Sequence, residues 1–266
     1  MNFDFSDDQK SLKDQARKFL SEKAGAKVTR GVLDNPGKSY DEPLWRSVAE
    51  MGWLGVAIPE EHGGLGLGRL ELCVLAEEIG RAVAPIPFSS TVYFFAEALM
   101  LAGSDAQKKT HLPNVASGET IGCFALSEGP GAPTAAGIQA KFDGSTLNGV
   151  KIPVTDGDCA DWAVVVAKEG SGVSLVLVDL KQAGVTRTTL KTLDPTRGHA
   201  KIEFKGAKAE RLGAGGQGWE LAEAILDRAA VLLAFEQVGG SQACLEMSTD
   251  YAKNRYAFSR QIGSFQ

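Results

Sequence analysis

The residues best suited to bind a ligand stand at the end of the chain, where Arg255, Phe258 and Gln266 follow a long helical pattern. A guanidinium carries a fixed charge and a planar fork of donors, which suits a phosphate or pyrophosphate group. A single exposed arginine is ordinary on a helix. The joint spacing of a cation, aromatic rings and an amide is less ordinary, and it indicates a binding segment.

A second candidate lies in the middle of the chain, where the run Phe-Ala-Leu-Ser-Glu at 124–128 leads into a turn rich in glycine and proline. Gly and Pro close many strands for backbone reasons alone. Further on, the Leu-Asn-Gly-Val-Lys turn at 147–151 is followed by the segment Ile-Pro-Val-Thr at 152–155. This segment ends with a hydroxyl side chain, that of Thr155. These two segments are the other candidates for a binding site.

The first part of the chain, to about Gly118, has a helical pattern. Ser6 and Gln9 have the spacing of a capping box, and apolar residues then recur on one helical face. A later helix, opened by the pair Ser104 and Gln107, is expected to stop near Pro113 because proline disfavours helix continuation. Other helices are expected at 43–51, 72–79 and 92–99.

From Glu119 the pattern changes to short runs of β-branched and aromatic residues between Gly, Asp and Pro turns. No segment long enough for a helix lies between these runs, so an antiparallel barrel or sandwich is expected rather than βαβ units. The strands are expected at 121–126, 163–166, 175–178, 185–190 and 202–204.

A glycine-rich segment at 213–218 opens the last part of the chain, which keeps a helical period for about thirty residues. The segment matches the dinucleotide fingerprint G-x-G-x-x-G, but no second strand follows, so we interpret it as a flexible joint. A long helix of this kind suits a helix bundle. Because a bundle cut after one helix would expose its apolar stripe, we expect the chain to be part of a longer protein.

The predicted fold is therefore α+β and multidomain. Its parts are an N-terminal helical domain (1–118), a middle antiparallel β-barrel or sandwich domain (119–212) and the first part of a C-terminal helical bundle (213–266).

Composition excludes several functional classes. The net charge of −5 argues against nucleic acid as a main partner, since phosphate binding needs a clustered basic face. No apolar run approaches the length of a bilayer span, and the acidic first residues lack a signal pattern, so a cytoplasmic location without membrane contact is expected. The four cysteines and three histidines are scattered, which gives a metal site no support.

Three segments, in order along the chain, resemble motifs of the acyl-CoA dehydrogenase family. The run 124–133 is similar to the family's flavin loop, 147–155 to its L-x-G-x-K turn and W-I-T motif, and 255–266 to its R-x-x-F-G-x-x-I-x-x-F-Q segment. The resemblance covers the whole chain. It implies the cofactor FAD and an acyl-CoA substrate.

The resemblance also implies roles for single residues. Phe124, Leu126 and Ser127 would line the isoalloxazine ring, and Thr155 would hydrogen-bond the flavin. Arg255, Phe258 and Gln266 would reach across a subunit interface to the pyrophosphate and adenosine of a neighbour's FAD. Asp227 matches an aspartate that contacts CoA.

Four residues, spread over the three motifs, depart from the family's pattern. The pair Ala132–Pro133 stands where Gly-Ser is usual, and that serine normally helps to hold the acyl-CoA. Pro153 replaces the tryptophan that packs against the flavin, and Ser259 replaces a glycine.

The family's reaction needs a carboxylate that removes the α-proton while the β-hydride goes to the flavin. Such a base must sit in a dry pocket that raises its pKa toward neutrality. In a minority of members it stands on the long helix at the position of Ala229, and alanine cannot act as a base. We therefore assign no catalytic residue in this chain and expect the base beyond Gln266. Glu236 is expected to be buried, paired and structural.

The resemblance implies an oxidoreductase that dehydrogenates an acyl-CoA to the enoyl-CoA, passes electrons to an acceptor, and assembles as a homodimer, homotetramer or heterotetramer. One alternative is a degenerate subunit that binds no FAD and pairs with an active homologue. Another is a flavin monooxygenase or a nitroalkane-oxidase-like enzyme on the same scaffold.

Overall fold

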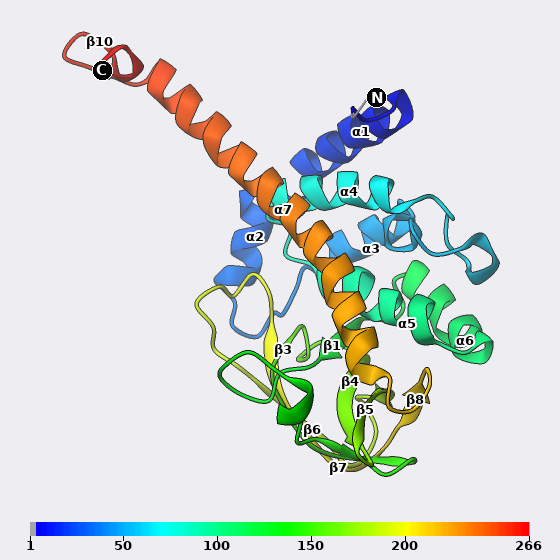
Figure 1. Cartoon of the computed structure of the whole chain (residues 1–266). Coiled ribbons are helices and arrows are strands. Elements are labelled where there is room, and N and C mark those ends of the chain that lie inside the picture. The colour runs from blue at the N-terminus through cyan, green and yellow to red at the C-terminus, as the bar shows by residue number, and fades with distance from the viewer. Residues whose placement is uncertain (1–3, 266) are drawn as a thin grey trace.

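The chain forms helices, then a sheet, then one long helix, as predicted (Figure 1). The computed structural model describes residues 4–265. In the first part, short 3₁₀ turns at Trp53–Gly55 and Glu60–His62 join the longer helices. These helices are α1 (Asp7–Lys23), α2 (Ala26–Leu33), α3 (Glu42–Glu50), α4 (Arg69–Arg81), the π-helical segment η3 (Ser89–Ala96), α5 (Glu97–Ala102) and α6 (Asp105–Ala116).

Both predicted capping boxes are present. Ser6 caps α1 and Ser104 caps α6, each with the glutamine three residues on returning a hydrogen bond. The predicted stop near Pro113 was wrong, because α6 continues to Ala116. Proline removes only one backbone donor, and burial of Val115 holds the last turn of the helix against the core.

The middle part forms one eight-stranded sheet with the order β6-β7-β3-β2-β4-β5-β8, and β1 pairs with β4. All five predicted strands exist. Most pairs are antiparallel, but β1 and β2 each run parallel to β4, which the sequence did not predict. The strands are β1 (Gly122–Ala125), β2 (Lys141–Phe142), β3 (Thr146–Thr155), β4 (Trp162–Glu169), β5 (Gly172–Asp179), β6 (Val185–Thr189), β7 (His199–Lys208) and β8 (Glu210–Leu212).

The long helix α7 (Gly218–Asn254) crosses α4 and then projects from the rest of the chain (Figure 1). Two glycines permit the close crossing. A Cβ on Gly80 would lie 2.1 Å from the Glu236 carbonyl oxygen, and one on Gly239 would lie 1.8 Å from the Glu77 carbonyl oxygen. Beyond this crossing α7 has exposed apolar side chains, and a hairpin of β9 (Tyr256–Ala257) and β10 (Arg260–Gln261) and a 3₁₀ turn, Ile262–Ser264, follow it.

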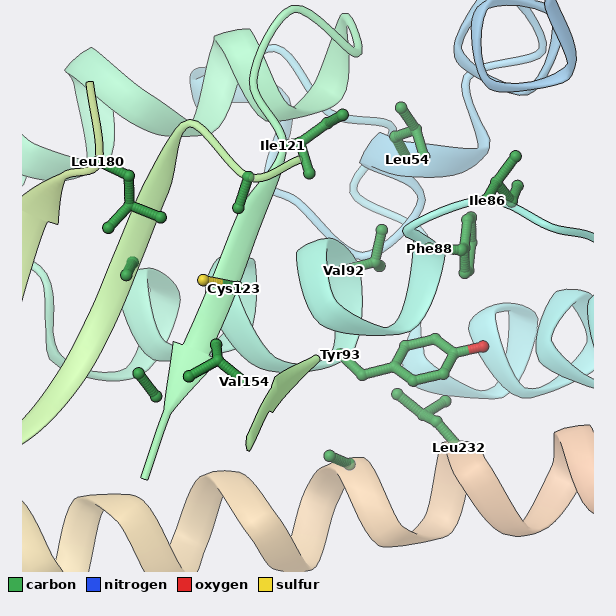
Figure 2. Packing of buried hydrophobic residues seen from close by; sticks show 14 of the residues in the cluster. Leu54, Ile86, Phe88, Val92, Tyr93, Ile121, Cys123, Val154, Leu180 and Leu232 are labelled. Atoms are coloured by element: carbon green, nitrogen blue, oxygen red, sulfur yellow. The ribbon is translucent and has the colours of Figure 1, made fainter. Parts of the chain in front are cut away.

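A hydrophobic cluster joins the three parts of the chain. It contains Val92 and Tyr93 of η3, Cys123 of β1, Val154 of β3 and Leu232 of α7 (Figure 2). The cluster fixes η3 between the sheet and α7, and these are the elements that build the candidate site. None of the helices in residues 4–265 is long and apolar enough to cross a membrane.

Candidate functional site

A pocket of about 250 Å³ opens where η3, the sheet and α7 meet. Five of its lining side chains are polar and three are apolar. The lining residues are Ser89, Ser90 and Phe94 from η3, Phe124 from β1, Thr155 from β3, Arg197 and His199 at the start of β7, and Leu233 from α7.

Two of the residues predicted to bind a flavin, Phe124 and Thr155, line this pocket together. Phe124 stacks on Phe94 with ring centroids 6.0 Å apart. Thr155 is the direct cross-strand partner of His199, and the Thr155 Oγ1 lies 3.3 Å from the His199 Nε2. An aromatic wall and an oriented hydroxyl therefore face the same space.

The backbone of Arg197 fixes the tautomer of His199. The His199 Nδ1 lies 3.1 Å from the Arg197 carbonyl oxygen, which can only accept, so Nδ1 carries the hydrogen. In the neutral imidazole Nε2 is then the acceptor and takes a hydrogen bond from Thr155. The lone pairs of the Thr155 hydroxyl remain available to a donor on a ligand.

The polar side of the pocket rests on two buried carboxylates. Arg197 donates to Ser89 Oγ at 2.6 Å and also pairs with Glu236 of α7, which is 7% exposed. Ser90 donates to Asp156 Oδ2 at 2.6 Å. Burial raises the pKa of Asp156 to about 7, although the hydrogen bond from Ser90 acts in the opposite direction. Glu236 is thus buried and paired, as expected.

Leu126 and Ser127 follow directly after β1, in a separate open pocket of about 570 Å³ lined by the predicted flavin loop. Leu126 is 8% exposed, and Ile152 N–H donates to the Ser127 carbonyl oxygen at 2.8 Å. This bond fastens the loop to β3 at Ile152, three residues before Thr155. The predicted ring-lining residues therefore occupy two pockets along β1.

A buried ion pair holds this loop in place. Lys151 is fully buried and donates to the Leu126 carbonyl oxygen at 2.9 Å and to Glu128 Oε1 at 2.7 Å. Burial lowers the pKa of Lys151 to about 8, against the effect of Glu128. Burial also opposes the charge on Glu128, but hydrogen bonds from Lys151 and from the Ala140 amide outweigh it and keep the pKa of that carboxyl low.

The other predicted residues lie apart from both pockets within one chain. The end of α7 projects from the rest of the chain (Figure 1), and Arg255 and Phe258 follow it in the sequence. Phe258 is 92% exposed. Asp227 is exposed on α7. Gln266 lies outside the described residues. Pro153, at the position of the missing tryptophan, is also exposed.

Sequence reasoning missed Ser89, Ser90, Arg197 and His199. These residues belong to no motif, and the chain separates η3 from β7 by about a hundred residues. The only available signal was the cluster of polar side chains at 196–199 just before a predicted strand. Among the residues described, no group of His, Cys, Asp and Glu is placed to hold a metal ion.

The three successive parts of the chain match three successive family models. They are the acyl-CoA dehydrogenase N-terminal domain at residues 6–119, the middle domain at 123–207 and the C-terminal domain at 216–266. Together with the fold and the pocket, these matches show that the chain belongs to the acyl-CoA dehydrogenase family.

Known relatives agree with this assignment. The chain is 32% identical to the mitochondrial isovaleryl-CoA dehydrogenase of Solanum tuberosum over 98% of its own length and 67% of the relative's. It is 29% identical to the acyl-CoA dehydrogenase IpdE2 of Mycobacterium tuberculosis, covering 98% of the chain and 68% of IpdE2. The chain thus spans about two thirds of the length of these relatives.

Solved structures share the fold. Butyryl-CoA dehydrogenase from Megasphaera elsdenii superimposes with a TM-score of 0.91 at 27% identity, over 100% of this chain and 74% of that one. The ChsE4-ChsE5 complex from Mycobacterium tuberculosis gives a TM-score of 0.88 at 29% identity, over 100% of this chain and 72% of that one. The family is one of oxidoreductases that act on acyl-CoA, and neither alternative function is favoured by these relatives.

Proposed function

We propose that this chain carries the FAD-binding and acyl-binding part of an enzyme that oxidises an acyl-CoA to the α,β-enoyl-CoA. The observation that supports this most directly is the pocket where η3, the sheet and α7 meet. It contains Phe124 and Thr155, two residues predicted for the flavin, beside side chains that sequence reasoning had not connected with them.

The residues present suit FAD in part. Phe124 offers an aromatic wall, and Thr155 offers a hydroxyl held by His199. Leu126 and Ser127 offer an apolar wall and the backbone of a loop fastened by Lys151. When bound, FAD supplies the acceptor for the β-hydride of the substrate. Pro153 removes one aromatic surface, so the contact with the ring is smaller than the family's pattern provides.

We further propose that the FAD site is shared between two subunits. Arg255 and Phe258 stand at the projecting end of α7, where they are free to contact another subunit. The guanidinium of Arg255 suits the pyrophosphate of a neighbour's FAD, and we keep Gln266 as a predicted hydrogen-bond partner of the dinucleotide. The partner subunit is either a second copy or a homologue, giving a homodimer, homotetramer or heterotetramer.

The α-proton must be removed by a group outside the pocket lining described here. None of the lining residues is a carboxylate, and Ala229 is a buried apolar side chain on α7. Glu236 is held by Arg197. We therefore propose that the base is contributed by residues other than these, and that Asp227 contacts the CoA. A separate electron acceptor and a cytoplasmic location complete the proposal, although several relatives are mitochondrial.

Flavin binding tests this proposal. The full-length protein is purified with FAD, and the ratio of flavin to protein is measured for the wild type, Thr155→Ala, Arg255→Ala and an equimolar mixture of the two variants. In a dimer each FAD site would use Thr155 of one subunit and Arg255 of the other, so each variant alone should lose flavin from both sites. A mixed dimer should keep flavin at one site, because that site then has both wild-type side chains. Wild-type protein that never retains flavin would contradict the proposal.

A further inference from the structure

Resting on the proposed function, we infer that the pocket accepts an acyl group that carries a neutral oxygen substituent, a hydroxyl or a keto group, against the Ser89–Arg197 side. The apolar lining side chains Phe94 and Leu233 take the hydrocarbon part, and Phe124 is left to the flavin. A plain alkyl chain would leave the hydroxyl hydrogen of Ser89 without an acceptor.

Ser89 is the side chain best placed to recognise such an oxygen. It is 4% exposed and lines the pocket. Its Oγ accepts a hydrogen bond from Arg197 Nη1 at 2.6 Å, so its own hydrogen remains to be donated. A buried polar group without a partner is costly, and an acceptor oxygen on the substrate would remove that cost.

Ser90 complements Ser89. Because its hydrogen goes to Asp156 at 2.6 Å, Ser90 offers lone pairs to the pocket. A substrate hydroxyl could therefore accept from Ser89 and donate to Ser90, while a keto oxygen would use Ser89 alone. Neighbouring residues of η3 thus present a donor and an acceptor to the same pocket.

The charges around the pocket exclude a carboxylate as the preferred group. Arg197 is 32% exposed and could attract an anion, but Glu236 pairs with it directly. Asp156 lies close enough to act on the same guanidinium. The local charge is therefore neutral to negative, and an anionic acyl chain would gain no unpaired cation.

Binding measurements on the FAD-loaded full-length protein test this inference. Dissociation constants are measured by titration calorimetry without oxygen, with the flavin reduced by dithionite beforehand so that no thioester is oxidised, for hexanoyl-CoA, its 4-, 5- and 6-hydroxy derivatives, 5-oxohexanoyl-CoA and adipoyl-CoA. The variants are Ser89→Ala, Glu236→Gln and the control Ser171→Ala, which changes an exposed turn residue between β4 and β5. Thermal unfolding confirms that each variant is folded.

We expect at least one hydroxy or oxo compound to bind about five- to tenfold more tightly than hexanoyl-CoA, as one satisfied hydrogen bond would give. Ser89→Ala should bring this ratio close to one, while Ser171→Ala should leave it unchanged. Glu236→Gln should improve the binding of adipoyl-CoA, because Arg197 then lacks its counter-charge.

Hexanoyl-CoA or adipoyl-CoA as the tightest wild-type ligand would overturn the inference, and so would a preference that survives Ser89→Ala. These results leave acyl-CoA binding intact. Failure of the proposed function is different, because then none of the thioesters would bind.

Discussion

Replacement of Asp156 by asparagine should make the protein more stable at neutral and alkaline pH. Asp156 is 3% exposed beneath the pocket and has a positive φ of 55°, a conformation that asparagine also tolerates. The amide oxygen of asparagine can still accept the hydrogen bond from Ser90. The substitution therefore removes the charge and keeps the shape.

The magnitude follows from the pKa: a rise of about three units corresponds to at most roughly 4 kcal/mol over the whole titration, part of which is already lost below pH 4.5. Burial raises the pKa of Asp156 from 3.8 to about 7, with Arg197 and Asp158 acting in opposite directions. Because the folded-state pKa lies above the unfolded one, the stability that the neutral carboxyl allows is complete below pH 3.8 and is lost as the pH rises to about 7. Each tenfold change in the ionisation constant corresponds to about 1.4 kcal/mol, so the loss is roughly 2–4 kcal/mol.

Urea unfolding followed by circular dichroism at pH 4.5 and 8.5 measures this effect. The quantity of interest is the unfolding free energy of Asp156→Asn minus that of the wild type at each pH. The contributions of the other titrating groups, which both proteins share, cancel in this difference. It should be small at pH 4.5 and grow by roughly 2–3 kcal/mol at pH 8.5 in favour of the variant. A difference that does not change with pH would refute the reasoning about Asp156.

Two further substitutions test the elements that hold the site. Lys151→Met should cost about 3 kcal/mol of unfolding free energy, because Glu128 would keep its charge in a half-buried position. The double variant with Glu128→Gln should recover most of that loss. A double variant as unstable as Lys151→Met alone would contradict this reason. Gly239→Ala should cost at least about 3 kcal/mol, since its Cβ would lie 1.8 Å from the Glu77 carbonyl oxygen. Gly240→Ala is the matched control, with its nearest neighbour at 3.7 Å. Equal melting temperatures for these two variants would show that the crossing of α4 and α7 is not tight.

Local patterns predicted the elements but not all of their pairings. The capping boxes at Ser6 and Ser104 and the long period of α7 depend on neighbouring residues, so the sequence shows them directly. The parallel pairing of β1 with β4 was missed because a run such as 121–126 has the same pattern whichever way its partner runs. Pro113 was misjudged because tertiary burial outweighs the loss of one backbone hydrogen bond. The boundaries 1–118, 119–212 and 213–266 stay a prediction.

The residues of the candidate site also fall into those that sequence motifs indicate and those that only the fold brings together. Phe124 and Thr155 could be predicted as candidates because they stand in motifs with fixed spacing, and the structure brings them into one pocket. Arg197 and His199 come near Thr155 because β3 pairs with β7 and places Thr155 opposite His199. Ser89 reaches the same pocket from η3. No sequence pattern contains that long-range pairing, so the polar side of the pocket could not be predicted.

The central claim is that this chain belongs to an enzyme that holds FAD and passes hydride to it from an acyl-CoA. The most direct test is an anaerobic titration of the purified, FAD-loaded full-length protein with a panel of acyl-CoA thioesters, followed through the visible absorbance of the flavin. We predict that at least one thioester bleaches the oxidised flavin and yields the corresponding enoyl-CoA. Bound flavin that stays oxidised with every thioester, or a protein that retains no flavin, would contradict the account.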